Sequence, residues 1–448
     1  MGDEVVNDIA VDSKGNVVFV GSINSSSNFA DNCPALMTGS CPLNTLGGMD
    51  VFVVKVDPSG IPLWTIVAGD PNPTQEARSV AFGPNDAVFI AGNYDGKIAF
   101  PGGTILENPT LTTSNIFVAK YNADGTHGWS KGFGDEFKQV VGGIAVDSTG
   151  DVVVTGYFTN SIDFGCLDGM MMPNLLTSTG SNDIFVVKFR GTDGSCVWNR
   201  SFGDPKDQRA AAVDIDKNND AIYFTGRCAG VFPVNSMMPT LDCGQSGMDV
   251  IVGKLDSMGE PIWGIRFGDT ADQEGTSIAV APDGKIAVTG RFFGTLDFGG
   301  GMSATAPGVF EDAFVVQLDS TGLATWARWF SSTGKQAGTS VAIGDNGQVF
   351  VAGEMTGSVQ FGLKLLSATG TDAFVLAYDS LGNTICGNNY GDTDAQSGVA
   401  IASINTNEIV AGLNYQGTVD LDYTAQCLAP APSATFQDAL VGKFTLKP

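Results

Sequence analysis

The chain has 448 residues, and its 48 aspartates and glutamates against 23 lysines and arginines give a formal net charge of −25. Such a charge repels a phosphate backbone, so nucleic acid is not an expected partner. The sequence contains no run of about 18 apolar residues and begins MGDEVV, without a basic and apolar leader, so we expect a soluble chain whose export signal is absent or already removed.

The sequence is built from repeats. The stretch from Phe133 to Gly165 returns 134 residues later, starting at Phe267, and intermediate copies reduce the period to about 67 residues. A repeat of this length is typical of solenoids, propellers and arrays, in which each unit packs only on its neighbours. A strand of the type DxFVxK marks seven copies, at Asp50, Asn115, Asp183, Asp249, Asp312, Asp372 and Asp438.

Each copy contains four short predicted strands. In the third copy, the apolar runs Ile144 to Asp147 and Asp151 to Gly156 flank a Ser-Thr-Gly turn and predict a hairpin. A second hairpin follows, because Ile184 to Phe189 and Trp198 to Phe202 flank the turn at Gly191 to Gly194. Helical periodicity is almost absent. Seven such antiparallel sheets predict an all-β, seven-bladed β-propeller of four-stranded blades.

The repeats predict one domain. Its third strands, such as FVVKVD from Phe52 and FVVKFR from Phe185, are apolar on both faces, as expected of a sheet between two others. The domain covers residues 1–448, with blades at roughly 1–70, 71–134, 135–203, 204–268, 269–331, 332–391 and 392–448.

Small residues mark the predicted central axis, where the first strands crowd together. Blade four departs from this series with Asp214, either a carboxylate held by a backbone donor or facing a wet channel, or a contact for an axial ion or ligand. The alanines are Ala10, Ala81, Ala145, Ala279, Ala342 and, depending on the register, Ala400 or Ala402.

The combination of DAFVxKxDxxGxxxW, GDxxxQ, IAVDxxGxVxVTG and DFG resembles the bacterial SBBP-type β-propeller repeat across essentially the whole chain. The resemblance implies a propeller of the kind common in secreted and cell-surface bacterial proteins. It implies no shared catalytic activity, because a fold alone does not confer one.

The last copy is incomplete. A fourth-strand tryptophan recurs five times, Cys386 replaces it in the sixth copy, and the seventh copy has no such strand. We therefore expect three strands in the last blade, or a partial fourth borrowed from Met1 to Asp8. An uncovered edge could pair with a partner strand. The tryptophans are Trp64, Trp129, Trp198, Trp263 and Trp326.

Six glutamines recur where the first strands begin. They could form a ring of ligand-binding amides at the channel mouth, or they could clip the loop of one blade to the next by satisfying buried backbone groups. Recurrence in every blade favours the second interpretation. The residues are Gln75, Gln139, Gln208, Gln273, Gln336 and Gln396.

Signatures of metal binding and catalysis are sparse. The densest acidic turn, Asp214 to Ala221, is a possible calcium site but occupies an ordinary hairpin position, and no EF-hand loop is present. His127 is the only histidine, and no GxSxG, P-loop or zinc spacing occurs. We predict no catalytic residue, metal ligand or cofactor. Paired carboxylates at the channel mouth remain the alternative, as in carbohydrate-active hydrolases or lyases.

The eight cysteines lie off the regular repeat positions. Proximity suggests the pairs Cys33 with Cys41, Cys166 with Cys196, Cys228 with Cys243, and Cys386 with Cys427, among 105 formal pairings. Disulfides would indicate an oxidising, extracytoplasmic compartment, and buried free thiols would indicate a cytosolic one.

Regular blades joined by variable loops favour a non-enzymatic interaction or scaffold module. Strands two to three and four to one are joined on one face of the disc, hereafter the loop face, and the short turns lie on the opposite, tight-turn face. We expect a protein or glycan partner of a secreted or cell-surface chain to bind the loop face. Exposed methionines suit adaptable contacts, and two aromatics are expected to pack under the loops. The methionines are Met170, Met171, Met172, Met237 and Met238, and the aromatics are Phe100 and Phe310.

Overall fold

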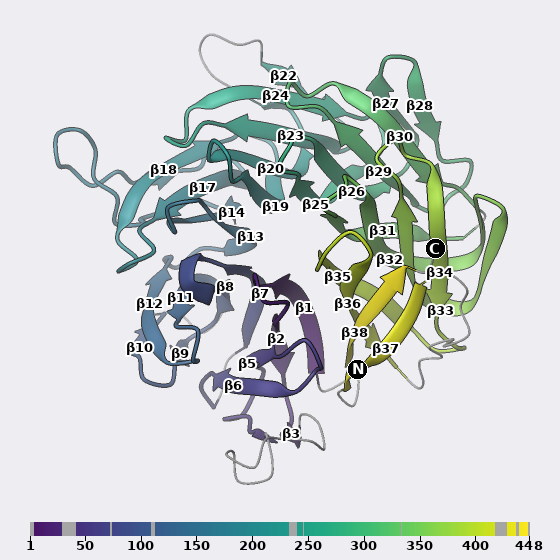
Figure 1. Ribbon diagram of the computed structural model, residues 1–448. Coiled ribbons are helices and arrows are strands. Elements are labelled where there is room, and N and C mark those ends of the chain that lie inside the picture. Colours follow the sequence, from purple (N-terminus) through teal and green to yellow (C-terminus); the bar gives the residue numbers. More distant parts are fainter. Residues whose placement is uncertain are drawn as a thin grey trace.

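A ring of seven four-stranded antiparallel sheets surrounds a central channel, which confirms the predicted β-propeller (Figure 1). The first strands β1, β7, β13, β19, β25, β31 and β35 face the channel in every blade. The computed structural model describes residues 4–28, 42–71, 74–108, 113–232, 240–244, 246–332, 334–416, 428–435 and 439–446.

The strands follow the order predicted from the repeat. The first strands are β1 (Glu4–Val11), β7 (Gln75–Phe82), β13 (Gln139–Val146), β19 (Gln208–Asp216), β25 (Gln273–Val280), β31 (Gln336–Ile343) and β35 (Gln396–Ser403). The second strands are β2 (Val17–Ile23), β8 (Val88–Tyr94), β14 (Val152–Phe158), β20 (Ala221–Cys228), β26 (Ile286–Phe292), β32 (Val349–Phe361) and β36 (Glu408–Tyr415). The third strands are β5 (Asp50–Val56), β11 (Asn115–Tyr121), β17 (Asp183–Phe189), β23 (Asp249–Leu255), β29 (Asp312–Leu318), β33 (Lys364–Tyr378) and β38 (Ala439–Leu446). The outer strands are β6 (Pro62–Ala68), β12 (His127–Phe133), β18 (Cys196–Phe202), β24 (Pro261–Phe267), β30 (Ala324–Phe330), β34 (Thr384–Tyr390) and, in blade seven, β37 (Leu428–Thr435).

The segments between second and third strands form short ribbons. Each ribbon contacts the outer strand of its own blade, so these segments lie along the rim of the ring. In blade six, β32 and β33 extend into a single long hairpin that takes the place of a separate ribbon. A short 3-10 helix, η2 (Pro84–Asp86), turns between β7 and β8. The ribbons are β3–β4 (Ser27–Asn28, Pro42–Leu43), β9–β10 (Lys97–Ala99, Ile105–Glu107), β15–β16 (Ser161–Ile162, Leu176–Thr177), β21–β22 (Val231–Phe232, Leu241–Asp242) and β27–β28 (Thr295–Gly299, Met302–Thr305).

The last blade has three strands in the regular repeat order, as predicted, and its outer position is filled differently from the expectation. The sheet order is β35-β36-β38-β37, so the segment that joins the second and third strands supplies the outer strand. The expected loan from the N-terminus is wrong, because Glu4–Val11 is the first strand of blade one. The edge of β38 is covered by this chain, which removes the reason to expect a partner strand there.

The ring closes without a shared blade. The Asn414 amide at the end of β36 accepts a hydrogen bond from Val6 N at 3.0 Å and donates one to Val6 O at 2.9 Å. Asn93 of blade two makes the equivalent contacts to blade three, donating to Gln139 O at 2.8 Å and accepting from Val141 N at 3.2 Å. We call this arrangement the asparagine clasp. Blade seven is therefore joined to blade one by the device that joins two internal blades.

The core lies between the blades. Every residue of β5 and β17 is buried, which confirms that the third strands are covered on both faces. Each outer-strand tryptophan of the first four blades reaches the next blade; Trp129 Nε1, for example, donates to Gly191 O at 3.1 Å. Gly194 lies against the same indole with φ +71°, and a Cβ there would be 2.7 Å from a ring carbon of Trp129. The glycine of this turn is thus required by both backbone conformation and close approach.

The alanine register is also settled. Gly338 and Gly398 occupy equivalent positions, just before the β-bulge of their first strands. Ala342 and Ala402 each lie four residues later, so Ala402, and not Ala400, is the member of the alanine series in blade seven.

Candidate functional site

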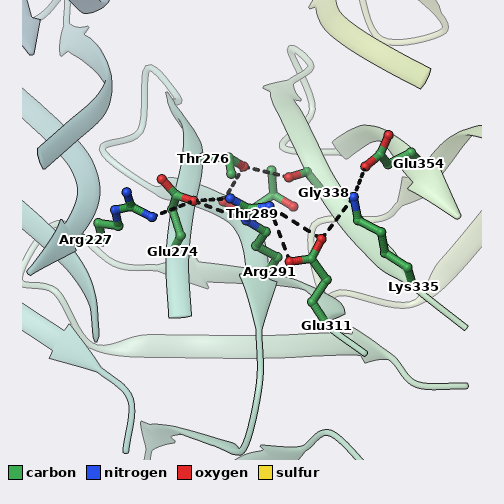
Figure 2. Close-up of polar contacts among 9 residues, drawn as sticks. All are labelled: Arg227, Glu274, Thr276, Thr289, Arg291, Glu311, Lys335, Gly338 and Glu354. Atoms are coloured by element: carbon green, nitrogen blue, oxygen red, sulfur yellow. Dashed lines mark hydrogen bonds and ion pairs between the residues drawn. The ribbon is translucent and has the colours of Figure 1, made fainter. Parts of the chain in front are cut away.

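A continuous row of charged side chains crosses blades four to six on the loop face. We call it the charged belt, and it runs in the order Arg227, Glu274, Arg291, Glu311, Lys335, Glu354 (Figure 2).

The geometry of the belt is tightest at its centre. Arg291 Nη2 lies 2.7 Å and Nε 3.1 Å from Glu274 Oε2, and Arg291 Nη1 lies 3.3 Å from Glu311 Oε2. Lys335 Nζ then bridges Glu311 at 3.2 Å and Glu354 at 2.6 Å. Arg227 is held more loosely, with Nη1 3.7 Å from Glu274 Oε2. One glutamate therefore serves two arginines, and Arg227 has the weaker share.

The belt replaces the asparagine clasp. Arg227, Arg291 and Glu354 occupy the same register position as Asn93 and Asn414. In each of these blades, it is the second-strand residue that pairs with the second residue of the first strand. The other blades have uncharged residues there, Ser22 and Tyr157. Three consecutive blades thus carry ionic groups at one structural position.

The belt is a partly buried network, with side-chain exposure from 11% at Glu311 to about 40% at Arg291 and Lys335. Burial acts to lower the pKa of Arg291, but the hydrogen bond and charge of Glu274 outweigh it and raise that pKa. The Lys335 pKa is raised in the same way, because Glu354 and Glu311 outweigh burial. Ion pairs at the surface contribute about 0.2–1 kcal/mol each. Arg291 and Lys335 are the members of the belt that are most accessible to a partner.

A threonine fixes the backbone under the belt. Thr276 Oγ1 lies 2.7 Å from Gly338 O of blade six and 3.2 Å from Thr289 O of its own blade (Figure 2). The Gly338 position has no room for a side chain, since a Cβ there would lie 2.1 Å from Thr289 Oγ1. The seam beneath the belt is therefore closely packed and hydrogen-bonded.

A cavity of about 260 Å³ opens beside the Arg227 end of the belt. Met248 and Phe293 give it apolar walls, while Arg227, Asp272 and Glu274 give it charge. Arg227 Nε is buried and has no hydrogen-bond partner among the described residues, and Asp272 is exposed. The cavity thus offers one incompletely paired cation, one exposed acid and an apolar surface.

The central channel is a larger cavity of about 550 Å³. Asp214 lines it and accepts hydrogen bonds from Val280 N at 2.7 Å and Ile215 N at 2.8 Å. Asp8 lines it too and accepts from Ser79 Oγ, Val80 N and Ile9 N at 2.7–2.9 Å. Burial raises the pKa of both acids, that of Asp8 to about 6. Asp214 is thus held by backbone donors and also faces the channel; a ligand contact there stays a prediction.

The six predicted glutamines lie inside the blades and do not line the channel. All are at most 1% exposed, and Gln273 illustrates their contacts: Nε2 lies 2.9 Å from Asp269 Oδ1 and 2.8 Å from Phe293 O. The Gln273 backbone N–H also donates to Met248 O of the previous blade at 2.6 Å, which joins the two blades. The side-chain contacts of Gln273 thus stay within blade five and its backbone makes the bond to blade four, so the clip by a side-chain amide stays a prediction. In β1 the equivalent position is Glu4, which the glutamine series did not include.

The methionine prediction divides by position. Met170, Met171 and Met172 are exposed on a turn held by Asp168, whose Oδ1 accepts hydrogen bonds from Met170 N and Met172 N at 2.8 Å. Met237 and Met238 lie outside the described residues. Phe100 is buried under its loop, as expected. Phe310 is half exposed, so the same expectation is wrong there, because Phe310 lies after the β27–β28 ribbon and does not pack beneath it.

Two predicted disulfides are confirmed, Cys166–Cys196 and Cys228–Cys243. The first ties the segment after β15 to the outer strand β18, and the second closes the base of the β21–β22 ribbon. Cys386 is also disulfide-bonded. Cys33, Cys41 and Cys427 lie outside the described residues.

The acidic turn proposed for calcium is internally hydrogen-bonded. Asp216 Oδ1 accepts a hydrogen bond from Asn218 N at 3.0 Å, and Asp216 Oδ2 accepts one from Asn219 Nδ2 at 2.7 Å. No group of three or more His, Cys, Asp or Glu side chains in the described ranges is placed to hold a metal ion. Among the same residues, no helix is both long and apolar enough to cross a membrane.

The belt is the feature that reading the sequence missed. A signal was present, because the residue after the TG or AG dipeptide of the second strand is charged in three consecutive copies, at Arg227, Arg291 and Glu354. The same position is uncharged in the two preceding copies, at Asn93 and Tyr157. An alignment of the copies at this one position would therefore have located half of the belt.

Two curated proteins resemble the chain distantly. It is 26% identical over 406 residues to an uncharacterised WD repeat-containing protein of Acanthamoeba polyphaga mimivirus, covering 77% of this chain and 29% of that protein. It is 26% identical over 180 residues to the regulatory protein FlaEY of Caulobacter vibrioides, covering 38% of this chain and 18% of that protein. The chain therefore spans less than a third of these curated relatives. No family model matches it.

Two solved structures align with most of the chain at low identity. The Dos1 propeller aligns with a TM-score of 0.43 at 10% identity, covering 99% of this chain and 93% of that one. BamB from Moraxella catarrhalis aligns with a TM-score of 0.37 at 13% identity, covering 94% and 98%. Likeness at this level carries no conclusion about what the chain binds.

Proposed function

We propose that this β-propeller is a non-enzymatic protein-interaction scaffold and that the charged belt with its adjoining cavity is the centre of the contact surface. The observation that carries the proposal is the departure of three consecutive blades from the repeat at one partly exposed position. Elsewhere this position is uncharged, so the ring assembles without the charges. Their presence is explained by a partner with complementary charges, because charged groups across an interface set the orientation and specificity of protein complexes. The distant WD repeat-containing relative is in keeping with a scaffold role.

The proposed partner is a protein, and a glycan is the second candidate. Both would meet a surface that combines ionic groups with the apolar walls Met248 and Phe293. The proposed location is extracytoplasmic, supported by the Cys166–Cys196 and Cys228–Cys243 disulfides, because such bonds persist in oxidising compartments. An SBBP-type repeat in a secreted or surface protein remains part of this proposal.

The competing proposal is a carbohydrate-active enzyme with carboxylates in the channel. Such chemistry needs two carboxyl groups that can reach a substrate. Asp8 and Asp214 each accept at least two hydrogen bonds from neighbouring groups, which favours the scaffold. A glycan array followed by hydrolysis assays separates the two, since an enzyme would release product and lose activity in an Asp8→Asn, Asp214→Asn variant.

The test of the scaffold proposal uses charge reversal. Arg227→Glu is compared with Arg200→Glu, an equally ordinary arginine whose ion pair with Glu260 lies at the tight turns of blades three and four. Capture of the native partner, identified by cross-linking to the wild-type chain, should fall at least tenfold for Arg227→Glu and stay unchanged for Arg200→Glu. Equal capture by both would overturn the proposal. Grafting short turns over 166–179 and 228–243 tests separately whether the rim segments contribute.

A further inference from the structure

A recurrent acid-and-amide pair lies at the seams between blades. The residue that opens the DxFVxK motif of a third strand packs against the glutamine that begins the first strand of the next blade. Asp249 with Gln273 and Asp372 with Gln396 are two such pairs, and all four side chains are at most 4% exposed. We call the acid of each pair the seam acid.

The two side chains of a pair direct oxygens at the same point. A Cβ on Gly268 would lie 2.1 Å from Asp249 Oδ1 and 2.5 Å from Gln273 Oε1. At the equivalent seam of blade six, a Cβ on Gly391 would lie 2.4 Å from Asp372 Oδ1 and 2.5 Å from Gln396 Oε1. Two buried hydrogen-bond acceptors therefore lie close to the same glycine at each seam.

The glutamine cannot resolve this conflict by turning its amide. Gln273 Nε2 already donates to Asp269 Oδ1 at 2.9 Å and to Phe293 O at 2.8 Å, which uses both of its protons. Neither Asp249 Oδ1 nor Gln273 Oε1 has a donor among the described residues. The seam therefore lacks the one proton that would let Asp249 Oδ1 and Gln273 Oε1 form a hydrogen bond.

The seam of blade six shows the same shortage. Gln396 Nε2 donates to Asp392 Oδ1 at 2.8 Å and to Gln416 O at 3.1 Å. One backbone N–H, that of Asp392, reaches Gln396 Oε1 at 3.2 Å. At this seam the glutamine oxygen therefore has one donor, and Asp372 Oδ1 has none among the described residues.

Blade two has a different residue at this position. Its seam residue is Asn115, next to Gln139, and a Cβ on Gly134 would lie 2.4 Å and 2.7 Å from their respective oxygens. Unlike a carboxylate, an asparagine amide carries a donor at every pH, and turned by about 180° it would direct Nδ2 toward Gln139 Oε1. The chain thus has an amide at one seam and a carboxyl group at others.

The charged groups around the seam acids differ. Asp249 Oδ2 accepts from Arg266 Nη1 of β24 at 2.8 Å, while Asp269 of the following loop and Asp242 of the ribbon oppose its ionisation. Asp372 Oδ2 accepts from the neutral amide of Asn389 at 2.6 Å, and Asp392 opposes its ionisation.

Burial dominates at each seam acid. It raises the pKa of Asp249 to about 6 in spite of Arg266, and it raises the pKa of Asp372. The pKa of the seam acids Asp50, Asp183 and Asp312 is raised for the same reason.

We propose that the seam acids are proton-binding sites: the protonated carboxyl group donates its O–H to the glutamine oxygen of the next blade, so that acidification tightens the ring. The O–H hydrogen bond joins two blades, and ionisation leaves two acceptors near the same glycine with no proton between them. This inference does not depend on what the loop face binds.

The sign follows from linkage. A carboxyl group whose pKa is raised on folding binds protons more tightly in the folded ring, so its contribution is favourable at low pH and is lost as pH rises through the folded pKa. For Asp249 that window runs from about pH 4 to about pH 6. Above it, the folded chain carries the cost of buried charge.

The test replaces the titrating group by a permanent donor. Asp249→Asn with Asp372→Asn keeps an acceptor for Arg266 and for Asn389 and supplies an N–H to each glutamine. The thermal midpoint Tm of this variant should match that of the wild type at about pH 4.5 and exceed it at about pH 7.5, where the wild-type acids are ionised. Asn115→Asp should do the opposite, with a lower Tm than the wild type at the higher pH only.

The control is Asp124→Asn, an exposed turn acid whose pKa is lowered by Thr126, which should not raise Tm at the higher pH. Two results would overturn the proposal. One is a Tm loss in the double variant that is equal at both pH values, which would show that the ionised carboxylate holds the seam. The other is a rise in wild-type Tm on adding calcium at about pH 7.5 that is absent in the double variant, which would assign a cation to the seam.

Discussion

The two faces of the disc use the same repeat differently. On the tight-turn face, Asp57, Asp256, Asp319 and Asp379 each accept two backbone N–H groups of their own turn, two and four residues further on. On the loop face, a single register position carries Asn93, Arg227 or Glu354 according to the blade. The difference shows that the same residue recurs where its side chain holds the backbone of every blade, as the turn aspartates do. On the loop face the position at the end of the second strand varies, and the belt is the most concentrated variation there.

The largest predicted effect comes from breaking a contact common to the blades beneath the belt. Gly290 pairs with Gly275, and a Cβ on Gly290 would lie 1.9 Å from Glu274 O. Gly290→Ala should lower the free energy of unfolding by about 3 kcal/mol, because backbone must move. Gly169→Ala is the control, since nothing lies within 4 Å of its Cβ. Thermal denaturation of both variants measures the difference, and equal stability would contradict the proposed close approach.

A smaller loss is expected at the ring closure. Asn414→Ala removes both hydrogen bonds to Val6 and leaves the N–H and C=O groups of Val6 without these partners. We expect the free energy of unfolding to fall by about 2 kcal/mol. Asn93→Ala removes the same clasp at a seam that a peptide connection also spans. Hydrogen exchange of β1 should therefore accelerate in the Asn414 variant much more than exchange of β13 in the Asn93 variant. Similar acceleration at both strands would show that the closure is no weaker than an internal seam.

The tryptophan contacts test the tight-turn side of the comparison. Trp129→Phe keeps most of the packing and removes the hydrogen bond to Gly191 O. We expect a loss of about 1 kcal/mol in the free energy of unfolding, measured by urea titration. An unchanged transition midpoint would show that the indole contributes by packing alone.

A small effect on stability is predicted at the centre of the belt. Arg291→Met removes a half-exposed cation that pairs with Glu274 and Glu311 and should cost about 1 kcal/mol or less. The cost should shrink further in high salt, which screens such pairs. A large, salt-independent loss of Tm would make the belt a structural clamp instead of a recognition surface.

Much of the architecture could be predicted from the sequence because the residues that make each contact recur in several copies of the repeat. The Gly-Asp-Gln spacing and the DxFVxK strand located the seams, and proximity located two disulfides. The outer strand β37 escaped prediction because LAPAPSAT follows no copy of the repeat, and its pairing depends on the edge of β38 that remains open. The belt escaped because its residues are ordinary charges in sequence. Only the ring places Arg227, Glu274 and Glu311, which belong to different strands and loops, in one row.

The central claim is that the belt serves a partner and not the fold. The most direct measurement determines Tm and partner affinity together for Arg227→Ala, the loosely paired end of the belt beside the cavity. The account predicts an unchanged Tm and an affinity at least tenfold weaker. A lower Tm with unchanged affinity would contradict it.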